Sequence, residues 1–498
     1  MKPTPPRLDR TAATPIAEQL AAHYRDAILA GRLRAGDRLP PIREVAELAG
    51  VTRTTVQEAY RRLGERGLVE GTVGRGTTVL RQPVDTHGSD AGSPLSSFAA
   101  AALRQSTGMP GAPPLPAGQP LVANFAELSP SAERFPVAEL RAAMDHVLCH
   151  RGGELLGYAG AVTGLPELRS LLARRSEPAS VITSVDDILV TSGGQQALDL
   201  VLRTFCTPGD AVVVTAPSYH QMYGLLTAHG LRIAPVPFTA AGIDLRALAD
   251  TLQSPDVRLV YLMPSFHNPT GRTLDLAARR ALVDVVGRTG VPILEDEYQH
   301  ALRFRGEPLP SLRALDPRGL TVTAMTFSKG LFPGLRTGWV QAGPALLRPM
   351  AAVKRFMDLE TSALLQAALV EFVQRGAMDR YLEALRGELL IRHTALQQAL
   401  ADPLPPGCTL SDPDGGFVAW LELPEPGQGD RLAELAATRG VRVVPGRVFD
   451  PQGKPSRGVR LSLTRADAPQ IRAGSAVLLD CIKDLVLGTS AATNRSFL

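Results

Sequence analysis

Thr323-Ala-Met-Thr-Phe-Ser-Lys-Gly330, followed by Leu331-Phe-Pro-Gly-Leu-Arg-Thr-Gly-Trp339, is the stretch that decides the fold. Its Lys329 is one of five lysines in a chain of 498 residues that carries 48 arginines. A primary amine condenses with an aldehyde, whereas a guanidinium does not. Lys329 also ends a strand-like apolar run and precedes a Gly- and Pro-rich turn, where α/β folds often place active-site residues. The stretch predicts a functional lysine; the alternative is an ordinary surface lysine.

The composition bounds the class of protein. The length suggests two or three domains, and a hydrophobic fraction of 44% is normal for a globular chain. No apolar stretch is long enough to span a membrane, and the first residues lack the apolar core of a signal peptide. The cysteines, at positions 149, 206, 408 and 481, are scattered without a Cys-x-x-Cys pair. They predict reduced thiols in a cytoplasmic protein rather than a disulfide framework or a zinc site.

The positive charge of the chain is concentrated at its start. Residues 1–80 hold 13 Lys+Arg and 9 Asp+Glu, and this excess of +4 equals the net charge of the whole chain. The remaining residues hold 40 charges of each sign. The distribution predicts a polyanionic partner for the first 80 residues.

The first 80 residues have the pattern of three helices and a hairpin. The predicted elements are helices from Pro15, over 43–49 and over 51–63, and strands over 68–70 and 77–80. Thr55 and Glu58 have the spacing of a capping box, so the third helix is expected to begin at or just before Thr55. This order of elements is that of a winged helix-turn-helix.

Polar and basic side chains stand where such a unit would meet DNA. The candidates are Thr52, Arg53, Thr54 and Thr55 at the start of the third helix, and Arg75 between two glycines. Side chains at that helix start can reach base edges and phosphates in a major groove, and Arg75 can enter a minor groove or meet phosphate. The alternative is a small protein-interaction bundle with a solvated basic face.

Residues 15–80 resemble the GntR-type winged helix. The resemblance rests on Leu33-Arg-Ala-Gly-Asp-Arg-Leu-Pro40, Arg43-Glu44, Gly50-Val-Thr-Arg-Thr-Thr-Val56, Ala59-Tyr60 and Gly67-Leu-Val with Gly74-Arg-Gly-Thr77. It implies double-stranded operator DNA as a partner for a domain over residues 1–80. In relatives the residues at the positions of Arg43, Arg53, Thr55, Arg75 and Gly76 contact DNA.

The rest of the chain divides into a linker and an α/β domain. Residues 81–119 have the Pro-, Gly- and Ser-rich composition of a linker, interrupted by an Ala-rich turn at about 97–104. From residue 120 helical segments alternate with short apolar strands, which predicts a mainly parallel sheet. The strand candidates are 188–191, 211–215, 231–236, 259–263, 292–295 and 321–324. Helices over 344–400 and a strand-rich ending predict a smaller α+β subdomain over about 345–498.

A lysine amine that binds an aldehyde indicates pyridoxal phosphate (PLP) as the cofactor. Each functional group of PLP needs a particular kind of partner in the protein. The ring nitrogen needs a carboxylate, the phenolic oxygen needs a donor, the ring needs an aromatic cover, and the phosphate needs a helix N-terminus with hydroxyls and a cation. The candidates are Asp296 with Tyr298 on the same side, Asn268, Tyr219, and, for the phosphate, Gly193, Gly194, Gln195, Ser328 and Arg336. Arg460 can hold a substrate α-carboxylate bidentately.

Each of these candidates has an ordinary alternative. Ser-Gly-Gly and Asn-Pro-Thr-Gly are common turn sequences, an Asp at a strand end often caps a helix, and Arg460 can be a surface arginine. The functional interpretation is favoured because the candidates all follow predicted strands, in one order, around one lysine.

Residues 120–470 resemble the class I aminotransferases of PLP fold type I. The resemblance rests on Ser192-Gly-Gly-Gln-Gln, Pro217-Ser-Tyr, His267-Asn-Pro-Thr-Gly, Asp296-x-Tyr298, Ser328-Lys329, Gly334-Leu-Arg-x-Gly338, Arg460 and Gly157-Tyr-Ala-Gly. It implies a large α/β domain with a mainly parallel seven-stranded sheet. It also implies that Lys329, Asp296 and Tyr298 are catalytic and that Tyr158 reaches the partner subunit's PLP phosphate.

The two domains in one chain resemble the MocR/GabR-type transcription regulators. The resemblance implies a homodimer, head-to-tail and domain-swapped, that binds paired operator half-sites. PLP itself or a small amino compound that reacts with it would be the effector. Two alternatives stay open: a working amino-acid aminotransferase with an accessory DNA-binding domain, and a PLP sensor without an amino ligand. Fast transamination with two substrates would favour the first, and a response of operator binding to PLP alone would favour the second.

Overall fold

The computed structural model describes residues 8–10, 14–29, 32–72, 76–80, 95–107, 111–176, 183–401 and 404–494. The chain divides into two compact units, Met1–Pro94 and Leu95–Leu498. No helix within the described ranges combines the length and the apolar character that crossing a membrane would require.

The first unit is a winged helix-turn-helix, as predicted. Its elements are α1 (Ile16–Leu29), α2 (Ile42–Ala49), α3 (Arg53–Glu65) and the antiparallel strands β1 (Val69–Thr72) and β2 (Gly76–Val79). Tyr24 of α1 and Tyr60 of α3 pack edge to face, with ring centroids 5.6 Å apart, beside the buried side chains of Val56 and Leu63. This aromatic contact fixes α3 against α1.

The predicted capping box at Thr55 and Glu58 is wrong. The N-cap of α3 is Thr52, whose extended backbone lets its hydroxyl accept the Thr55 N–H at 3.3 Å. Glu58 does not reach back to the cap, because its carboxylate accepts hydrogen bonds at 2.8 Å from Arg61 and from Arg62, one turn further along the helix. The helix therefore begins at Arg53.

The second unit is built on an eight-stranded sheet. Its strands, in order across the sheet, are β4 (Ile188–Thr191), β11 (Gly338–Gln341), β10 (Thr321–Thr326), β9 (Ile293–Asp296), β8 (Val257–Leu262), β5 (Ala211–Ala216), β6 (Arg232–Thr239) and β7 (Gly242–Ile243). The five strands from β10 to β6 are parallel, whereas β11 pairs antiparallel with both neighbours and β7 is a short hairpin partner of β6.

The six predicted strands are all present, so the mainly parallel sheet is confirmed, but the predicted number of seven strands is wrong. The eighth strand, β7, consists of two residues, too few to show an alternating pattern. Strand β11 was not among the candidates because Gly338 and Gln341 interrupt its apolar run.

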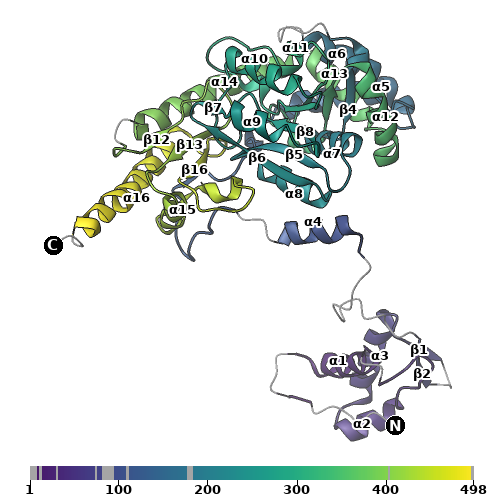
Figure 1. The fold of residues 1–498 in the computed structure, drawn as a ribbon. Coiled ribbons are helices and arrows are strands. Elements are labelled where there is room, and N and C mark those ends of the chain that lie inside the picture. Colours follow the sequence, from purple (N-terminus) through teal and green to yellow (C-terminus); the bar gives the residue numbers. More distant parts are fainter. Residues whose placement is uncertain are drawn as a thin grey trace. The chain divides into compact units, whose positions relative to one another are not determined.

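Helices cover both faces of this sheet (Figure 1). One face packs against α7 (Gly194–Phe205), α8 (His220–Ala228) and α12 (Pro344–Asp358). The other face packs against α6 (Pro166–Ser176), α9 (Leu245–Thr251), α10 (Leu276–Gly287), α11 (Leu312–Leu315), α13 (Ala363–Gln374) and α14 (Ala377–Leu396). Successive residues of a strand face opposite layers, so Val212 packs with α7 whereas Val213 packs with α10.

A smaller antiparallel sheet forms the subdomain at the end of the chain. Its strands are β12 (Thr409–Leu410), β13 (Val418–Glu422), β16 (Gly458–Ser462) and β15 (Val444–Pro445), covered by α15 (Gln428–Thr438) and α16 (Ala468–Asn494). A residue near the start of the second unit, Phe125, is buried in this core, because β3 (Ala123–Asn124) pairs with β14 (Val441–Arg442).

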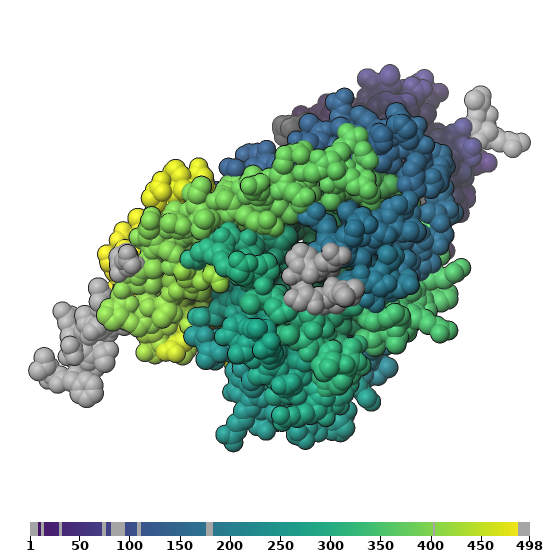
Figure 2. Space-filling view, turned by 90° about the horizontal axis from the view of Figure 1, so that it is seen from above, coloured from purple at the N-terminus to yellow at the C-terminus, as the bar shows by residue number. Residues whose placement is uncertain are grey.

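Segments far apart in the sequence also meet in the second unit. The Leu165 N–H donates to Gln366 Oε1 at 2.8 Å across 201 residues of chain, and Arg175 forms an ion pair with Asp379. Figure 2 shows the result as the blue surface around α5 (Val137–Leu155) and α6 next to the green surface around α12 to α14.

The segment predicted as a linker contains a helix, α4 (Ser97–Thr107), where an Ala-rich turn was expected. The helix packs against α8 (Figure 1), with the Phe98 ring 5.2 Å from the His229 ring and the Arg203 guanidinium 5.7 Å from Phe98. Asp199 accepts hydrogen bonds from both Arg203 and His229, which holds this docking surface in place. The predicted boundaries of the linker, 81–119, remain a prediction.

Candidate functional site

A cavity of about 260 Å³ lies where the C-terminal ends of the parallel strands meet. Its lining includes Gly194, Gln195, Tyr219, Asn268, Asp296, Tyr298, Ser328, Lys329 and Arg336, all of which the sequence had pointed to. In an open parallel sheet such an edge is the usual place for a ligand, because the loops after all the strands converge there. The structure thus brings together side chains that the sequence spreads over about 140 residues.

The N-terminus of α7 forms one wall of the cavity. The N-cap is Gly193 at φ +94°, and a Cβ there would lie 2.6 Å from Arg336 Nη2, so only glycine allows the guanidinium to pack against the turn. Arg336 has φ +49° and donates from Nη1 to Ser328 Oγ at 3.3 Å. Backbone N–H groups, a hydroxyl and a guanidinium therefore converge at one point, as an anion requires.

Lys329 projects into the cavity from the turn after β10. Its Nζ donates to the Leu128 carbonyl at 2.7 Å. Burial lowers the pKa of Lys329 to about 8, the positive charges of Arg460 and Arg336 act in the same direction, and Asp296 opposes them. A larger fraction of this amine is therefore neutral, and hence nucleophilic, near neutral pH than for an ordinary lysine.

Asp296 is the buried carboxylate of the cavity, at the end of the strand next to that of Lys329. Its Oδ2 accepts the Tyr261 hydroxyl at 2.9 Å. Burial raises the pKa of Asp296 to about 6, although the hydrogen bonds from Tyr261 and the Tyr298 backbone and the charge of Lys329 lower it. Tyr298 lines the same side, and its hydroxyl donates to the Phe266 carbonyl at 3.2 Å.

Arg460 reaches the site from β16 of the smaller subdomain. Its Nη1 donates to Asn268 Oδ1 at 3.2 Å, its Nη2 donates to the Ala126 carbonyl at 2.8 Å, and its Nε has no partner among the described residues. Burial lowers the pKa of Arg460 to about 10. Because the side chain is 5% exposed, an incompletely paired guanidinium here fits the capture of a carboxylate.

Three predicted residues are not part of the cavity lining: Gly193, which caps α7 next to the lining residue Gly194, Arg460, which is hydrogen-bonded to the lining residue Asn268, and Tyr158. Tyr158 is 87% exposed. The loop that carries Tyr158 is held by Glu360, whose carboxylate accepts the N–H groups of Ala159 and Ala161 at 2.9 and 3.0 Å. The predicted role of Tyr158, contact with the cofactor of a second subunit, remains a prediction.

Two residues behind the cavity were missed from the sequence. Asp358 accepts hydrogen bonds from Ser192 and Gln196, at 3.1 and 2.8 Å, and forms an ion pair with the fully buried Lys354. This network holds the turn at the start of α7. The scarcity of lysines was a signal that could have found Lys354, but no motif surrounds it.

The predicted DNA-binding residues lie on the first unit. Arg43 is on α2, where its Nε donates to Glu47 at 3.3 Å; Thr52 caps α3; and Arg53, Thr54 and Thr55 form its first turn. Thr52, Arg53 and Thr54 are exposed, and Gly76 begins β2 at φ +89°. Arg75 lies outside the described residues.

Residues 127–473 match the model of the family described as aminotransferase class I and II, and residues 16–79 match that of bacterial regulatory proteins of the gntR family. The chain belongs to the aminotransferase class I and II family and carries a gntR-family domain in front of it. Both resemblances drawn from the motifs are thereby confirmed.

Relatives share this two-part organisation or the second part alone. The probable rhizopine catabolism regulatory protein MocR of Rhizobium meliloti is 30% identical over 94% of each chain. The uncharacterized HTH-type transcriptional regulator YdcR of Escherichia coli is 31% identical over 89% of this chain and 94% of its own. The structure of LysN, an α-aminoadipate aminotransferase from Thermus thermophilus complexed with N-(5'-phosphopyridoxyl)-L-leucine, superimposes with a TM-score of 0.68 at 30% identity, covering 79% and 98% of the two chains.

Family membership implies pyridoxal phosphate as the cofactor, and the cavity fits it. The anion cradle at the start of α7 matches the phosphate, the buried Asp296 matches a protonated ring nitrogen, and Lys329 offers the amine. The Nε of Arg460, which has no partner among the described residues, is a donor that a carboxylate could use.

The lowered pKa of Lys329 makes a testable prediction. The rate at which the cofactor-free protein captures PLP covalently should rise with pH and level off above about 8, because the neutral amine is the nucleophile. The rate is measured by trapping the product with borohydride at each pH.

Arg460→Met removes a cation and should move the inflection to higher pH. The control Arg465→Met, which removes an exposed arginine paired with Glu127, should leave it unchanged. An inflection near the ordinary lysine value of 10.5 in the unaltered protein would contradict this account.

Proposed function

We propose that the chain is a PLP-dependent transcription regulator whose second unit senses an amino compound, or PLP itself, and changes the affinity of the first unit for operator DNA. The observation that carries the proposal is a cavity that fits PLP in one chain with a gntR-family domain. The full-length similarity to MocR and YdcR, named as regulators, supports it. The gntR-family domain also supports a cytoplasmic location, because its expected partner is DNA.

The first unit supplies the chemistry for DNA. Arg53 and its threonine neighbours are exposed at the N-terminal turn of α3, where a helix entering the major groove places its base-contacting residues. Further back on α3, Arg61 is bound to Glu58 and Glu65 of its own helix. Arg53 is therefore available to bind phosphate or a base edge, whereas the guanidinium of Arg61 is already bound by carboxylates of its own helix.

This difference gives a test of the DNA-binding face. Arg53→Ala should weaken operator binding by roughly 5- to 150-fold and lower the salt dependence by about one charge, as expected for one arginine contact. Arg61→Ala removes the same charge from the same helix and should change affinity less than about twofold. Both variants should keep their bound PLP. Equal losses in fluorescence-anisotropy titrations of the two variants would show that overall charge, rather than this face, governs binding.

In the second unit the residues of the cofactor cavity bind and orient PLP and its ligand, whereas the chemical reactivity comes from PLP. Bound PLP supplies an electrophilic aldehyde and an electron-withdrawing ring. Lys329 provides the amine, Asp296 holds a proton at the ring nitrogen, and Arg460 orients a carboxylate. Arg460 belongs to the smaller subdomain, whereas Lys329 lies in the turn after β10 of the large sheet, so a ligand that binds both favours one arrangement of the two subdomains.

A homodimer, head-to-tail and domain-swapped, completes the proposal. Exposed apolar side chains gather around the Tyr158 loop, since Glu360 ties this loop to the end of α12: Leu156 is 70% exposed, Phe356 92% and Leu359 55%. Such an exposed apolar patch favours an interface. In the proposed dimer a second copy placed there brings its Tyr158 toward the neighbouring cofactor. Two copies would also supply the two DNA-binding units that paired operator half-sites require.

Helix α4 supports a physical link between the two units. It is the first element after residues 81–94 and it docks on α8, the helix whose N-cap is Tyr219 of the cofactor cavity. A ligand that shifts Tyr219 therefore acts on the helix that holds the end of the connection to the DNA-binding unit.

This link predicts the effect of releasing α4. Phe98→Ala should speed amide exchange over residues 97–107 and reduce the factor by which PLP or an amine changes operator affinity, because it removes about 1–2 kcal/mol of apolar contact with α8. PLP binding should stay unchanged. Leu103→Ala, at a position of the same helix that is 56% exposed, is the matched control and should change neither quantity. A normal effector response in a Phe98→Ala protein with fast-exchanging α4 would refute the link.

A further inference from the structure

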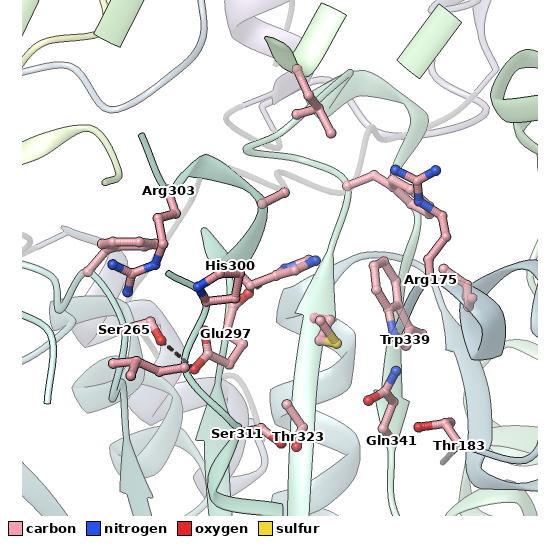
Figure 3. Close-up of a pocket in the computed structure, with 18 of the residues that line it drawn as sticks. Arg175, Thr183, Ser265, Glu297, His300, Arg303, Ser311, Thr323, Trp339 and Gln341 are labelled. Atoms are coloured by element: carbon pink, nitrogen blue, oxygen red, sulfur yellow. Dashed lines mark hydrogen bonds between the residues drawn. The ribbon is translucent and has the colours of Figure 1, made fainter. Parts of the chain in front are cut away.

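A second cavity, of about 410 Å³, lies on the opposite face of the sheet from the cofactor cavity. Its floor is formed by residues of β10 and β11, and its walls come from α6, from α14 and from the segment 300–311. Figure 3 shows side chains from these elements converging on one space, with Arg175 and Arg303 on opposite sides of it. Leu172, Phe327, Met378 and Leu382 give it an apolar interior.

Two buried polar groups line this interior. Trp339 is 4% exposed, and its indole N–H has no hydrogen-bond partner among the described residues. A buried donor without a partner costs roughly 1–3 kcal/mol, so such groups usually mark a place that a ligand or water fills. Glu297 is 5% exposed and accepts the Ser265 hydroxyl at 2.7 Å, the contact drawn in Figure 3. Burial and the neighbouring Glu295 raise the pKa of Glu297.

An incompletely paired cation stands at the wall of the cavity. Arg386 donates from Nε to the Ala301 carbonyl at 2.8 Å and forms no ion pair with any described residue. Partial burial and the charge of Arg175 lower the pKa of Arg386, although the charges of Asp379 and Glu383 oppose this shift. Asp379 forms its ion pair with Arg175. A guanidinium in this position would gain from an anion that it can bind through its Nη groups.

We infer that this cavity is a second ligand site, which takes a small carboxylate with an aromatic or branched apolar body and a hydrogen-bond acceptor at its far end. Arg386 binds the carboxylate, the apolar interior encloses the body, and the Trp339 N–H donates to the acceptor. The inference concerns binding by the second unit and does not depend on the proposed DNA function.

The second cavity shares structural parts with the first. Asp296 and Glu297 are consecutive, so their side chains face opposite sides of the sheet, one in each cavity. Met325 of β10 lines both cavities. A ligand that contacts Glu297 is therefore one peptide away from Asp296, and a ligand that contacts Met325 touches a side chain that also lines the cofactor cavity, so the site is placed to act as a regulatory one.

The chain offers a direct optical test, because it has two tryptophans and one of them lines the cavity. The full chain loaded with PLP and carrying Trp420→Phe leaves Trp339 as its reporter. Arg460→Met is added so that a carboxylate does not bind beside Lys329. The probes are 4-hydroxyphenylacetate, phenylacetate, which lacks the far oxygen, and 4-hydroxybenzyl alcohol, which lacks the carboxylate.

Saturable quenching of Trp339 by 4-hydroxyphenylacetate is expected. Binding should be about 2- to 10-fold weaker for phenylacetate and at least about 10-fold weaker for the alcohol. Arg386→Gln should weaken 4-hydroxyphenylacetate at least about 10-fold, whereas Arg380→Gln, at an exposed position of the same helix, should not. Met378→Phe, which fills the cavity, should abolish the quenching of Trp339. This second variant tests the inference even if Arg386→Gln fails to fold, which loss of its bound PLP would show. No quenching up to about 10 mM probe, or equal binding by the cavity variants and the parent, would overturn the inference.

Discussion

The structure of the second unit depends on one electrostatic constraint: a buried carboxylate, Asp296, and a partly buried amine, Lys329, are held at the ends of two neighbouring parallel strands. Ala324 of β10 pairs in register with Asp296 of β9, so the turn after β10 delivers Lys329 to the same edge. Burial disfavours both charges, raising the pKa of Asp296 and lowering that of Lys329, and each partner partly restores the other. Buried groups with shifted pKa values are common at functional sites, which supports the proposed role of these two residues.

Much of this centre could be predicted because its residues follow strands that alternate with helices. Parallel strands bring their C-terminal ends to one edge, so Gly194, Asp296 and Lys329, which end or follow strands, were expected at one site once the strands were recognised. The family matches over residues 16–79 and 127–473 confirm the two-domain organisation that the motifs had indicated.

What the sequence could not supply depends on packing between distant segments. The N-cap of α3 is Thr52 rather than Thr55, because the Glu58 carboxylate accepts hydrogen bonds from Arg61 and Arg62 and does not close a capping box. Helix α4 was hidden in a Pro- and Gly-rich region because its partner, α8, lies more than a hundred residues further along the chain. The second cavity gave no local pattern, since Trp339, Arg386 and Glu297 come from three separate elements.

The central claim is that occupancy of the Lys329 site alters DNA binding by the first unit. Its most direct test is the operator affinity of the unaltered chain and of Lys329→Ala, each titrated with PLP and then with a panel of amines. The account predicts that ligands change the affinity of the unaltered chain by at least about fivefold, the usual lower range of an allosteric coupling. The Lys329→Ala protein should bind DNA as the cofactor-free chain does and should not respond. An equal response in Lys329→Ala, or no response in the unaltered chain, would contradict it.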